Sequence, residues 1–333
     1  MKAFCIAKKD DKGYLALRQV PQPIPVGNDV RVKIYAVGLN PSDFQTMDHI
    51  ISQSTSTANV FQTNIILGLD IAGIVDEVGP GVTKWKKGDR VYCLREISNI
   101  HGGFAEYSLI PEKHLVALPE EISFVQAAAS PGAGFTAYVA IEEKLKPKEN
   151  EIILIHGGAG GVGSYAIQLA KRRGLIVYTT CLARDIEYVK SLGADVAVDF
   201  QQDDVHALLQ KDTAGEGIPY VLSSVGSQVA TKDLKHLAFN GEMVVTAGLP
   251  NLTQWQFYDR QLSVHEIAFG RMLTIGGKQL DEFQRIATAF TTLLAKGVLR
   301  APKITEIPFD DIPKGLDWLR KGEVTGKIVA TLN

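Results

Sequence analysis

The chain has 333 residues and a formal net charge of −2, so it offers no electrostatic basis for binding nucleic acid or an anionic membrane. At about 100–200 residues per domain its length favours two domains, and no apolar run approaches the roughly 18–20 residues of a membrane span. Its three scattered cysteines exclude a disulfide framework. The N-terminal apolar stretch is too short for a signal peptide, and we therefore expect a cytoplasmic protein.

The first third of the chain predicts a small β-rich domain. Apolar and polar residues alternate over residues 30–37, 72–78, 90–94 and 104–110. Many short strands, separated by turns rich in Gly and Pro, are typical of a β-barrel or sandwich. Residues 52–63 are rich in Ser, Thr, Gln and Asn, and we expect a loop there.

The pattern changes near Pro119, where strands and helices begin to alternate. After a helical stretch over residues 122–140, residues 151–155 form a continuous apolar run, which parallel strands buried on both faces require. Repeated β–α alternation predicts a doubly wound parallel sheet. Further strands are expected at 175–180, 195–198, 220–222 and 242–246, helices at 162–173, 205–210 and 228–238, an amphipathic helix at 283–294, and a last strand within 327–332.

A glycine-rich loop follows the first strand of this predicted sheet. Residues 158–163 match GxGxxG and lie between a buried strand and an amphipathic helix, the context in which the motif indicates a dinucleotide site. Gly158 would permit a tight turn, Gly160 would let the backbone approach a pyrophosphate, and Gly163 would allow close packing of helix on strand. The N–H groups at Gly161 and Val162 would face the anion. A glycine turn without a ligand is the alternative.

The end of the second strand bears on which dinucleotide is bound. NAD-binding domains usually carry an acid there, hydrogen-bonded to the ribose 2′-hydroxyl. This strand ends at Thr180, and the first acid is Asp185, which we expect to cap the next helix. Arg184 would pair with a 2′-phosphate, although it also fits an ordinary surface arginine. We therefore expect NADP(H) as the cofactor.

Several motifs in order and spacing carry a resemblance to a known family. They are residues 38–44, 67–73, 79–82, 88–91, 102–107, 158–163 and 191–194. Over nearly its whole length the chain resembles the medium-chain dehydrogenase/reductase superfamily, in its zinc-free quinone oxidoreductase-like branch. The resemblance implies a GroES-like catalytic domain over 1–120 and 267–333, a Rossmann dinucleotide-binding domain over 121–266, and an active site in the cleft between them. It also implies a homodimer that pairs edge strands, with residues 264–268 as candidates.

The positions that hold catalytic zinc in related alcohol dehydrogenases are altered. By the resemblance, those enzymes have cysteine at Asn40, histidine at Leu69, glutamate at Asp70, and a third protein ligand near Ala133. Leucine and alanine side chains cannot bind zinc, and too few donors remain for its usual three protein ligands. We therefore expect no metal.

Without a Lewis acid, hydride transfer to an electron-poor acceptor is easier than oxidation of an alcohol. The resemblance thus implies an NADPH-dependent reductase of quinones or α,β-unsaturated carbonyls. An enoyl-thioester reductase and a non-catalytic NADPH-binding relative are the alternatives. Asn40 is the candidate donor to the substrate oxygen and Asp43 its polar support, although both also fit a structural role at an Asn-Pro turn. The remaining cofactor candidates are Thr136, Val225, Gly226, Ala247, Gly248, Phe269 and Lys327.

Overall fold

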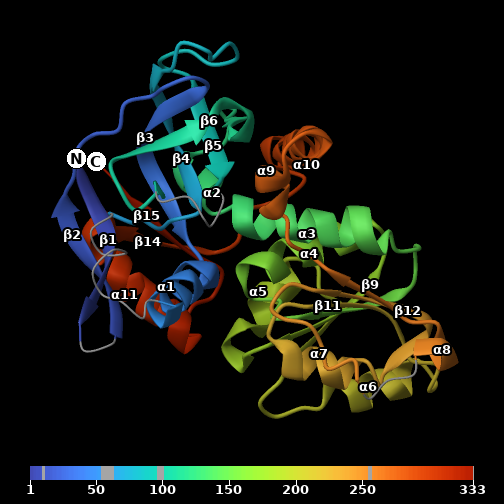
Figure 1. Cartoon of the computed structure of the whole chain (residues 1–333). Coiled ribbons are helices and arrows are strands. Elements are labelled where there is room, and N and C mark those ends of the chain that lie inside the picture. Colours follow the sequence, from blue (N-terminus) through green and yellow to red (C-terminus); the bar gives the residue numbers. More distant parts are fainter. Residues whose placement is uncertain (10–11, 54–63, 96–100, 254–256, 333) are drawn as a thin grey trace. The chain divides into compact units, whose positions relative to one another are not determined.

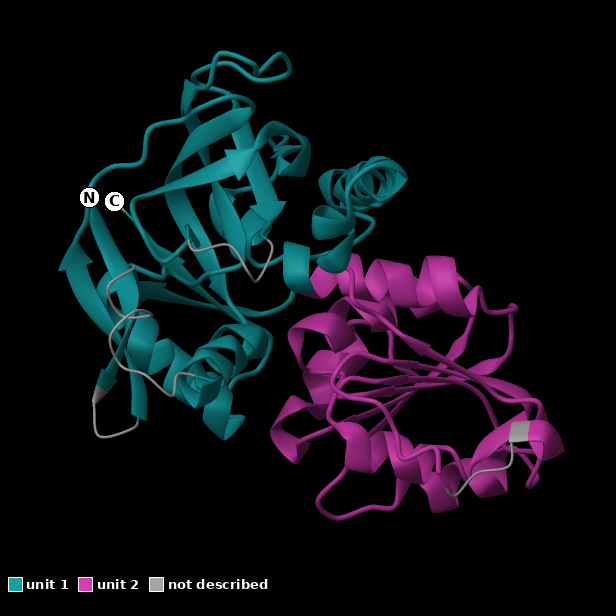
Figure 2. Ribbon diagram, viewed as in Figure 1, with its two compact units in different colours: residues 1–132, 270–333 teal, residues 133–269 magenta. Residues whose placement is uncertain are grey.

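The computed structural model describes residues 1–9, 12–53, 64–95, 101–253 and 257–332. The chain divides into two compact units, shown in Figures 1 and 2. Unit 1 comprises Met1–Gly132 and Gly270–Asn333, and unit 2 comprises Ala133–Phe269. Most of the loop expected over 52–63 lies outside the described residues.

Unit 1 is β-rich, as the alternating sequence predicts. One antiparallel hairpin pairs β1 with β2, and a seven-stranded sheet has the order β14-β15-β3-β4-β5-β7, with β6 also paired to β3. The strands are β1 Lys2–Lys9, β2 Lys12–Gln19, β3 Asp29–Leu39, β4 Asp70–Val78, β5 Arg90–Leu94, β6 Tyr107–Pro111, β7 Val116–Ala117, β14 Ile304–Pro308 and β15 Lys327–Thr331.

Strand β3 runs through the middle of this sheet. Along its first half, Val30, Val32 and Ile34 point into the core while the residues between them are more exposed. Its last four residues are all buried, because α2 lies against them: a Cβ atom on Gly38 would come within 2.1 Å of the Ala128 carbonyl oxygen. The chain therefore leaves β3 in a buried position, which places Asn40 inside unit 1.

The helices of unit 1 lie around this sheet. The structure has α1 Pro41–Gln53, α2 Phe124–Ala128, α9 Arg271–Ile275, α10 Lys278–Ala295 and α11 Ile312–Lys321, with 3-10 turns η1 Glu112–His114 and η5 Phe309–Asp311. Helix α10 confirms the predicted amphipathic helix, and its apolar side is buried. Strand β15 confirms the last strand expected within 327–332, whereas helix α11 was not expected; Pro313 lies in the first turn of α11 and Gly322 ends it.

Unit 2 is built on six parallel strands in the order β10-β9-β8-β11-β12-β13. Counted from β8, this is the order 3-2-1-4-5-6 of dinucleotide-binding domains. The predicted doubly wound parallel sheet is confirmed. The strands are β8 Ile152–His156, β9 Ile176–Cys181, β10 Val196–Asp199, β11 Ile218–Ser223, β12 Leu237–Val245 and β13 Ser263–Glu266.

Helices cover both faces of the parallel sheet (Figure 1). They are α3 Thr136–Tyr138, α4 Gly161–Arg172, α5 Ile186–Ser191, α6 Val205–Asp212, α7 Ser227–Asp233 and α8 Phe257–Arg260, with π-helical turns η2 Pro131–Phe135 and η3 Val139–Leu145 and the 3-10 turn η4 Ala183–Asp185. In α4, residues 163–170 are all buried. The buried strand β8 and the buried helix α4 hold the glycine loop between them.

The boundaries between the two units lie at different residues from those expected. We expected the middle domain over 121–266, whereas unit 2 begins at Ala133 and ends at Phe269. Residues 122–132 stay with unit 1 because α2 packs on its sheet: the rings of Phe124 and Tyr35 stack at 4.8 Å between centroids. The helical stretch expected over 122–140 is interrupted around Pro131.

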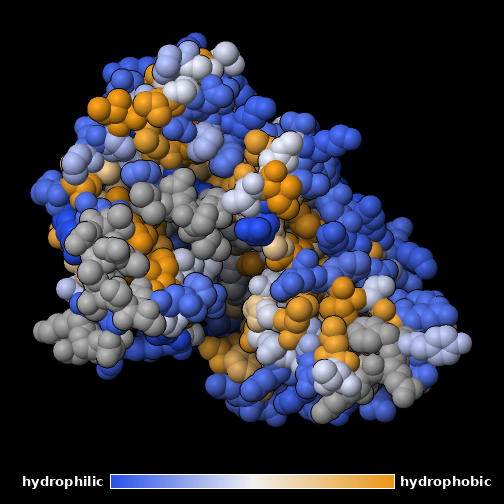
Figure 3. Space-filling model, viewed as in Figure 1, coloured by the Kyte–Doolittle hydropathy of each residue, from blue (hydrophilic) through white to orange (hydrophobic). Residues whose placement is uncertain are grey.

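The surface is mostly hydrophilic on the face shown in Figure 3, with hydrophobic residues in small patches. Among the described residues, no helix is both long and apolar enough to span a bilayer.

Candidate active site

The glycine loop connects β8 to α4, and at two of its glycines the packing leaves no room for a side chain. Gly157, just before the motif, has a φ of 70°, so the left-handed conformation lies at this residue and not at Gly158, where a tight turn was expected. A Cβ on Gly158 would lie 2.0 Å from Thr179 Oγ1, and one on Gly163 would lie 2.3 Å from the Gly157 carbonyl oxygen. Both glycines are therefore needed for packing the loop between strand and helix.

Gly160 differs from its neighbours because space is open above it. An added Cβ would meet only the Gly157 carbonyl oxygen, at 3.3 Å. Gly160 is also the N-cap of the 12-residue helix α4, and no side chain caps that end. The N–H groups at Gly161 and Val162 thus belong to an uncapped helix start beside a glycine without a side chain. This arrangement fits a dinucleotide pyrophosphate.

The end of β9 carries the residues that bear on cofactor choice. Thr180 is buried, and its hydroxyl lies 3.0 Å from His156 Nδ1 and accepts a 3.3 Å hydrogen bond from Gly157 N–H. The Arg184 side chain is 54% exposed, with Nε 3.7 Å from Asp185 Oδ2. Asp185 is the N-cap residue of α5, as expected, although its carboxylate makes no capping hydrogen bond to that helix. Arg184 is therefore the accessible charge at this strand end.

Two further loops of unit 2 leave the same edge of the sheet. After β11, a Cβ on Gly157 would lie 2.9 Å from Val225 Cγ1, so the turn containing Val225 lies beside the glycine loop. Gly226 follows with a φ of 121°. After β12, Ala247 and Gly248 are exposed. The structure thus gathers these candidates at the carboxyl ends of the strands, where ligands of such sheets bind.

Thr136 and Phe269 lie elsewhere in unit 2. Thr136 begins α3 and is partly buried. Phe269 is buried and packs edge-on against Phe135, the residue before Thr136, with 5.6 Å between ring centroids. These two candidates are therefore close to each other.

Unit 1 holds a buried polar network of Lys327, Asn40 and Asp70, which we call the Asn40 network. The Lys327 ammonium donates to Leu39 O at 3.0 Å, Asn40 Oδ1 at 2.6 Å and Asp70 Oδ2 at 3.1 Å. The Asp70 carboxylate also accepts from Asn40 Nδ2 at 2.9 Å and from Gly132 N–H at 2.8 Å. Every proton of the Lys327 ammonium thus has an acceptor within unit 1.

Asn40 is held at both ends of its amide. Its Oδ1 accepts from Lys327, and its Nδ2 donates to Asp70 and, over a longer 3.4 Å contact, to Gly38 O. The network therefore orients the Asn40 side chain. Of its two Nδ2 protons, the one on Gly38 O is held more weakly and is available to another acceptor. Asp70 belongs to this network and was missed as a candidate, although the comparison with zinc ligands had pointed at its position.

Asp43 supports the turn that follows β3. Its two carboxyl oxygens accept from Asn40 N–H at 2.8 Å and Gly68 N–H at 3.2 Å. Burial raises the pKa of the Asp43 carboxyl to about 7. The nearby Asp70 carboxylate adds to this rise, whereas the two N–H donors and the Lys327 ammonium oppose it. Asp43 is thus a buried acid that fixes the position of Asn40.

Two family models match the chain. One is the alcohol dehydrogenase GroES-like domain, over residues 27–120, and the other is the zinc-binding dehydrogenase model, over residues 161–292. The chain is 32% identical over 317 residues to a chloroplast envelope quinone oxidoreductase homolog of Arabidopsis thaliana, covering 93% of this chain and 92% of that protein.

Solved structures show the same fold. A quinone oxidoreductase of Pseudomonas syringae superposes with a TM-score of 0.86 and 26% identity, over 100% of both chains. The quinone oxidoreductase of Escherichia coli, solved in complex with NADPH, superposes with a TM-score of 0.84 and 24% identity, over 99% of both chains.

Proposed function

Because the chain belongs to the quinone oxidoreductase-like branch of the medium-chain dehydrogenase/reductase superfamily, we propose that it reduces quinones or α,β-unsaturated carbonyls with NADPH. That it is an oxidoreductase follows from the family. The glycine loop between β8 and α4 carries the cofactor part of the proposal, since its open Gly160 and uncapped helix start fit a pyrophosphate.

In unit 2, Arg184 would bind the 2′-phosphate of NADPH. It is exposed at the end of β9, and the neighbouring Asp185 carboxylate is buried. Thr180 would position the glycine loop, because its hydroxyl accepts a hydrogen bond from Gly157 N–H. The bound nicotinamide supplies the hydride, and the protein positions its ring. The residues proposed to contact the cofactor are Thr136, Gly158, Gly160, Gly161, Val162, Gly163, Arg184, Val225, Gly226, Ala247, Gly248 and Phe269.

We propose that the reaction needs no zinc at the Asn40 network. Leu69 offers no donor atom, and the Asn40 amide is engaged at both ends. The Lys327 ammonium already occupies Asp70 Oδ2, and a second cation beside it would be repelled. This donor set does not fit the three protein ligands that catalytic zinc uses.

The same network suits an acceptor that is already electron-poor. Conjugation carries the negative charge that arrives with hydride onto an oxygen, which one or two hydrogen bonds can stabilise. The second Asn40 Nδ2–H would donate to that oxygen at little cost, because its present contact with Gly38 O is 3.4 Å long. Lys327 and Asp43 would hold the Asn40 side chain and backbone in place.

A panel of acceptors tests the proposal. Purified protein is mixed with NADPH and a quinone, an enone, an enal or an enoyl thioester, and NADPH consumption is followed; ethanol with NADP⁺ is the control. We expect turnover of a quinone or an enone and none of ethanol. With NADPH deuterated at C4, the deuterium should appear at the electron-poor carbon of the enone.

Other results would redirect the assignment. Turnover of the thioester alone would favour an enoyl-thioester reductase, and NADPH binding without turnover of any acceptor would favour a non-catalytic relative. Oxidation of ethanol together with no reduction of quinone or enone would refute the proposal.

We also propose a homodimer that forms through β13. This strand ends the described sheet of unit 2 and pairs only with β12 there, so its outer edge can take a strand from a second copy. Light scattering at micromolar concentration should give twice the monomer mass. A monomer mass would count against this assembly.

A further inference from the structure

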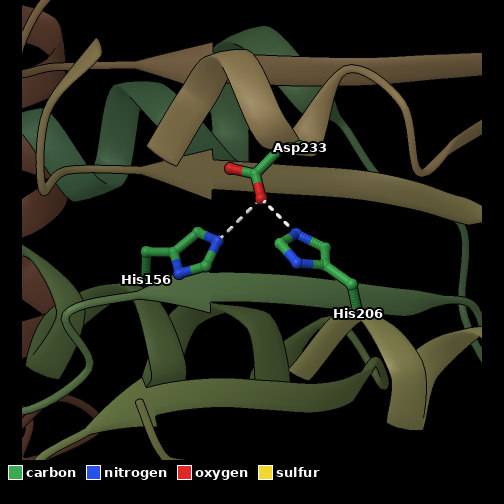
Figure 4. Close-up of side chains that lie close together, drawn as sticks. All are labelled: His156, His206 and Asp233. Carbon is green, nitrogen blue, oxygen red and sulfur yellow. Dashed lines mark hydrogen bonds and ion pairs between the residues drawn. The ribbon is translucent and has the colours of Figure 1, made fainter. Parts of the chain in front are cut away.

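Three side chains from separate elements of unit 2 meet around one carboxylate oxygen (Figure 4). His156 ends β8, His206 lies in the first turn of α6, and Asp233 ends α7. His156 Nε2 lies 2.9 Å and His206 Nε2 lies 2.7 Å from Asp233 Oδ1. One ligand atom from each residue falls within 4.8 Å of the others. Two imidazoles and a carboxylate therefore form one compact group, although His156 and Asp233 are 77 positions apart in the sequence.

The second oxygen of this carboxylate is unusual. Asp233 has a side chain with no solvent exposure, and its Oδ2 has no hydrogen-bond partner among the described residues. A buried carboxylate oxygen without a partner costs free energy, and most such atoms in folded proteins are satisfied. A cation bound by this carboxylate would offset that cost.

The outer nitrogens of the two rings also have oxygen neighbours. His156 Nδ1 lies 3.0 Å from Thr180 Oγ1, and His206 Nδ1 lies 3.6 Å from Asp204 Oδ1. Metal-binding histidines commonly donate the proton of their other nitrogen to a hydroxyl, carbonyl or carboxylate oxygen, which fixes the ring. With its proton on Nδ1, each ring would present the Nε2 lone pair toward Asp233.

The group is reachable from solvent on the His206 side. His206 and His236 line a pocket of about 460 Å³, which Lys235 and Arg260 also line. The His236 ring stacks on His206 with 4.2 Å between centroids. The His206 side chain is 14% exposed, whereas His156 and Asp233 are more deeply buried. A small ion can therefore reach the group through this pocket.

We propose that His156 Nε2, His206 Nε2 and the Asp233 carboxylate bind a divalent transition-metal ion of the zinc class. Two imidazoles and one carboxylate suit zinc, with water in the fourth position, whereas calcium and magnesium prefer oxygen ligands. Metal–ligand bonds of about 2.0–2.2 Å in a tetrahedron separate neighbouring donors by about 3.3 Å. The present O–N distances of 2.7 and 2.9 Å would lengthen by about half an ångström.

From the sequence we expected no metal in this chain, and the proposed site departs from that expectation. It lies in unit 2 and shares no residue with the Asn40 network. Its ligands come from β8, α6 and α7, and the ion would hold these three elements together. Because β8 leads into the glycine loop, we assign the ion a structural role beneath that loop.

The test measures metal binding directly, so it does not depend on catalytic activity. Protein without a polyhistidine tag is stripped with a chelator, dialysed against Zn²⁺ over a range of concentrations, and analysed for metal content. We expect one saturable site per chain in the parent protein. Replacing an outer-shell partner typically costs ~10–100-fold in metal affinity, so losing a ligand in His206→Asn or Asp233→Asn should cost at least ~100-fold.

His265→Asn is the matched control. His265 is another histidine of unit 2 with a carboxylate neighbour, Glu242, at 3.4 Å, but among the residues that the structure describes no third ligand lies beside that pair. This control should bind Zn²⁺ as the parent does. Zn²⁺ should also raise the melting temperature of the parent and the control, and leave that of the two ligand variants unchanged, because an ion that binds only the folded state stabilises it.

X-ray absorption of the zinc-loaded parent protein keeps the proposal falsifiable even where a variant fails to fold. We expect only nitrogen and oxygen neighbours, with the scattering pattern of two imidazoles. Sulfur neighbours, no saturable binding in the stripped parent, or unchanged affinity in folded His206→Asn and Asp233→Asn proteins would each overturn the proposal.

Discussion

Replacing Lys327 by methionine tests whether the Asn40 network stabilises unit 1. Methionine fills the space of the aliphatic stem but removes the ammonium from Leu39 O, Asn40 Oδ1 and Asp70 Oδ2. Asp70 has no solvent exposure, so its carboxylate would lose a buried ionic partner. Breaking a buried pair from one side costs about 3–5 kcal/mol, and we expect Lys327→Met to lower the free energy of unfolding of unit 1 by that amount.

The assay is urea unfolding followed by tryptophan fluorescence in a Trp255→Phe background. The two remaining tryptophans, Trp85 and Trp318, both belong to unit 1. Lys321→Met, which removes an exposed lysine of the same unit, should change stability by no more than about 0.5 kcal/mol.

A double variant sharpens the test. Asp70→Asn alone leaves the Lys327 ammonium buried without its carboxylate, whereas Lys327→Met with Asp70→Asn removes both charges of the pair. We therefore expect the double variant to lose less than the sum of the single losses, by about 0.5–3 kcal/mol. Unchanged stability in Lys327→Met would refute this reasoning. A loss of NADPH affinity without a loss of stability would instead support the cofactor contact that the sequence analysis expected of Lys327.

Three other predictions concern the two units separately. Arg184→Ala should weaken NADPH by at least ~10-fold and leave NADH nearly unchanged in fluorescence titrations; an equal loss for both would contradict its phosphate role. Gly160→Ala should weaken NADPH binding without changing the melting temperature, whereas Gly163→Ala, whose Cβ would lie 2.3 Å from Gly157 O, should cost about 1–3 kcal/mol in urea unfolding. For Asp43, a pKa of about 7 when folded against 3.8 as the ordinary value means that only the folded state keeps the proton between these pH values. Its contribution to stability should therefore fall as pH rises from about 4 to 7 and then level off, and a parent whose pH profile matches that of Asp43→Asn would disprove it.

The parallel sheet of unit 2 could be predicted because its signals are local. Strand β8 is a continuous apolar run, and the glycine loop follows it directly, so neighbours in sequence are also neighbours in space. The family resemblance extended this prediction to the GroES-like unit. The boundary near Ala133 was less predictable, because the stacking of Phe124 on Tyr35 joins residues 89 positions apart.

The polar groups could not be predicted in the same way. A lysine near the C-terminus gives no sign that its partners are Asn40 and Asp70, 287 and 257 residues earlier. His156, His206 and Asp233 lie in no common motif, and only the folding of β8, α6 and α7 brings them together. Single residues in a sequence indicate their chemistry, but their partners depend on the tertiary structure.

The Asn40 network, which stabilises the fold of unit 1, also bears on the kind of acceptor that we propose. Where related alcohol dehydrogenases are expected to hold a metal ion, this chain has an ammonium that is covalently fixed to β15 and bonded to Asn40 and Asp70. An ammonium balances the Asp70 charge, but with all its protons engaged it offers no open coordination position to polarise an alcohol oxygen. A site of this kind depends on an acceptor activated by its own conjugation. If Lys327→Met protein remains folded, its residual activity should thus still favour quinones and enones, and should not include alcohol oxidation.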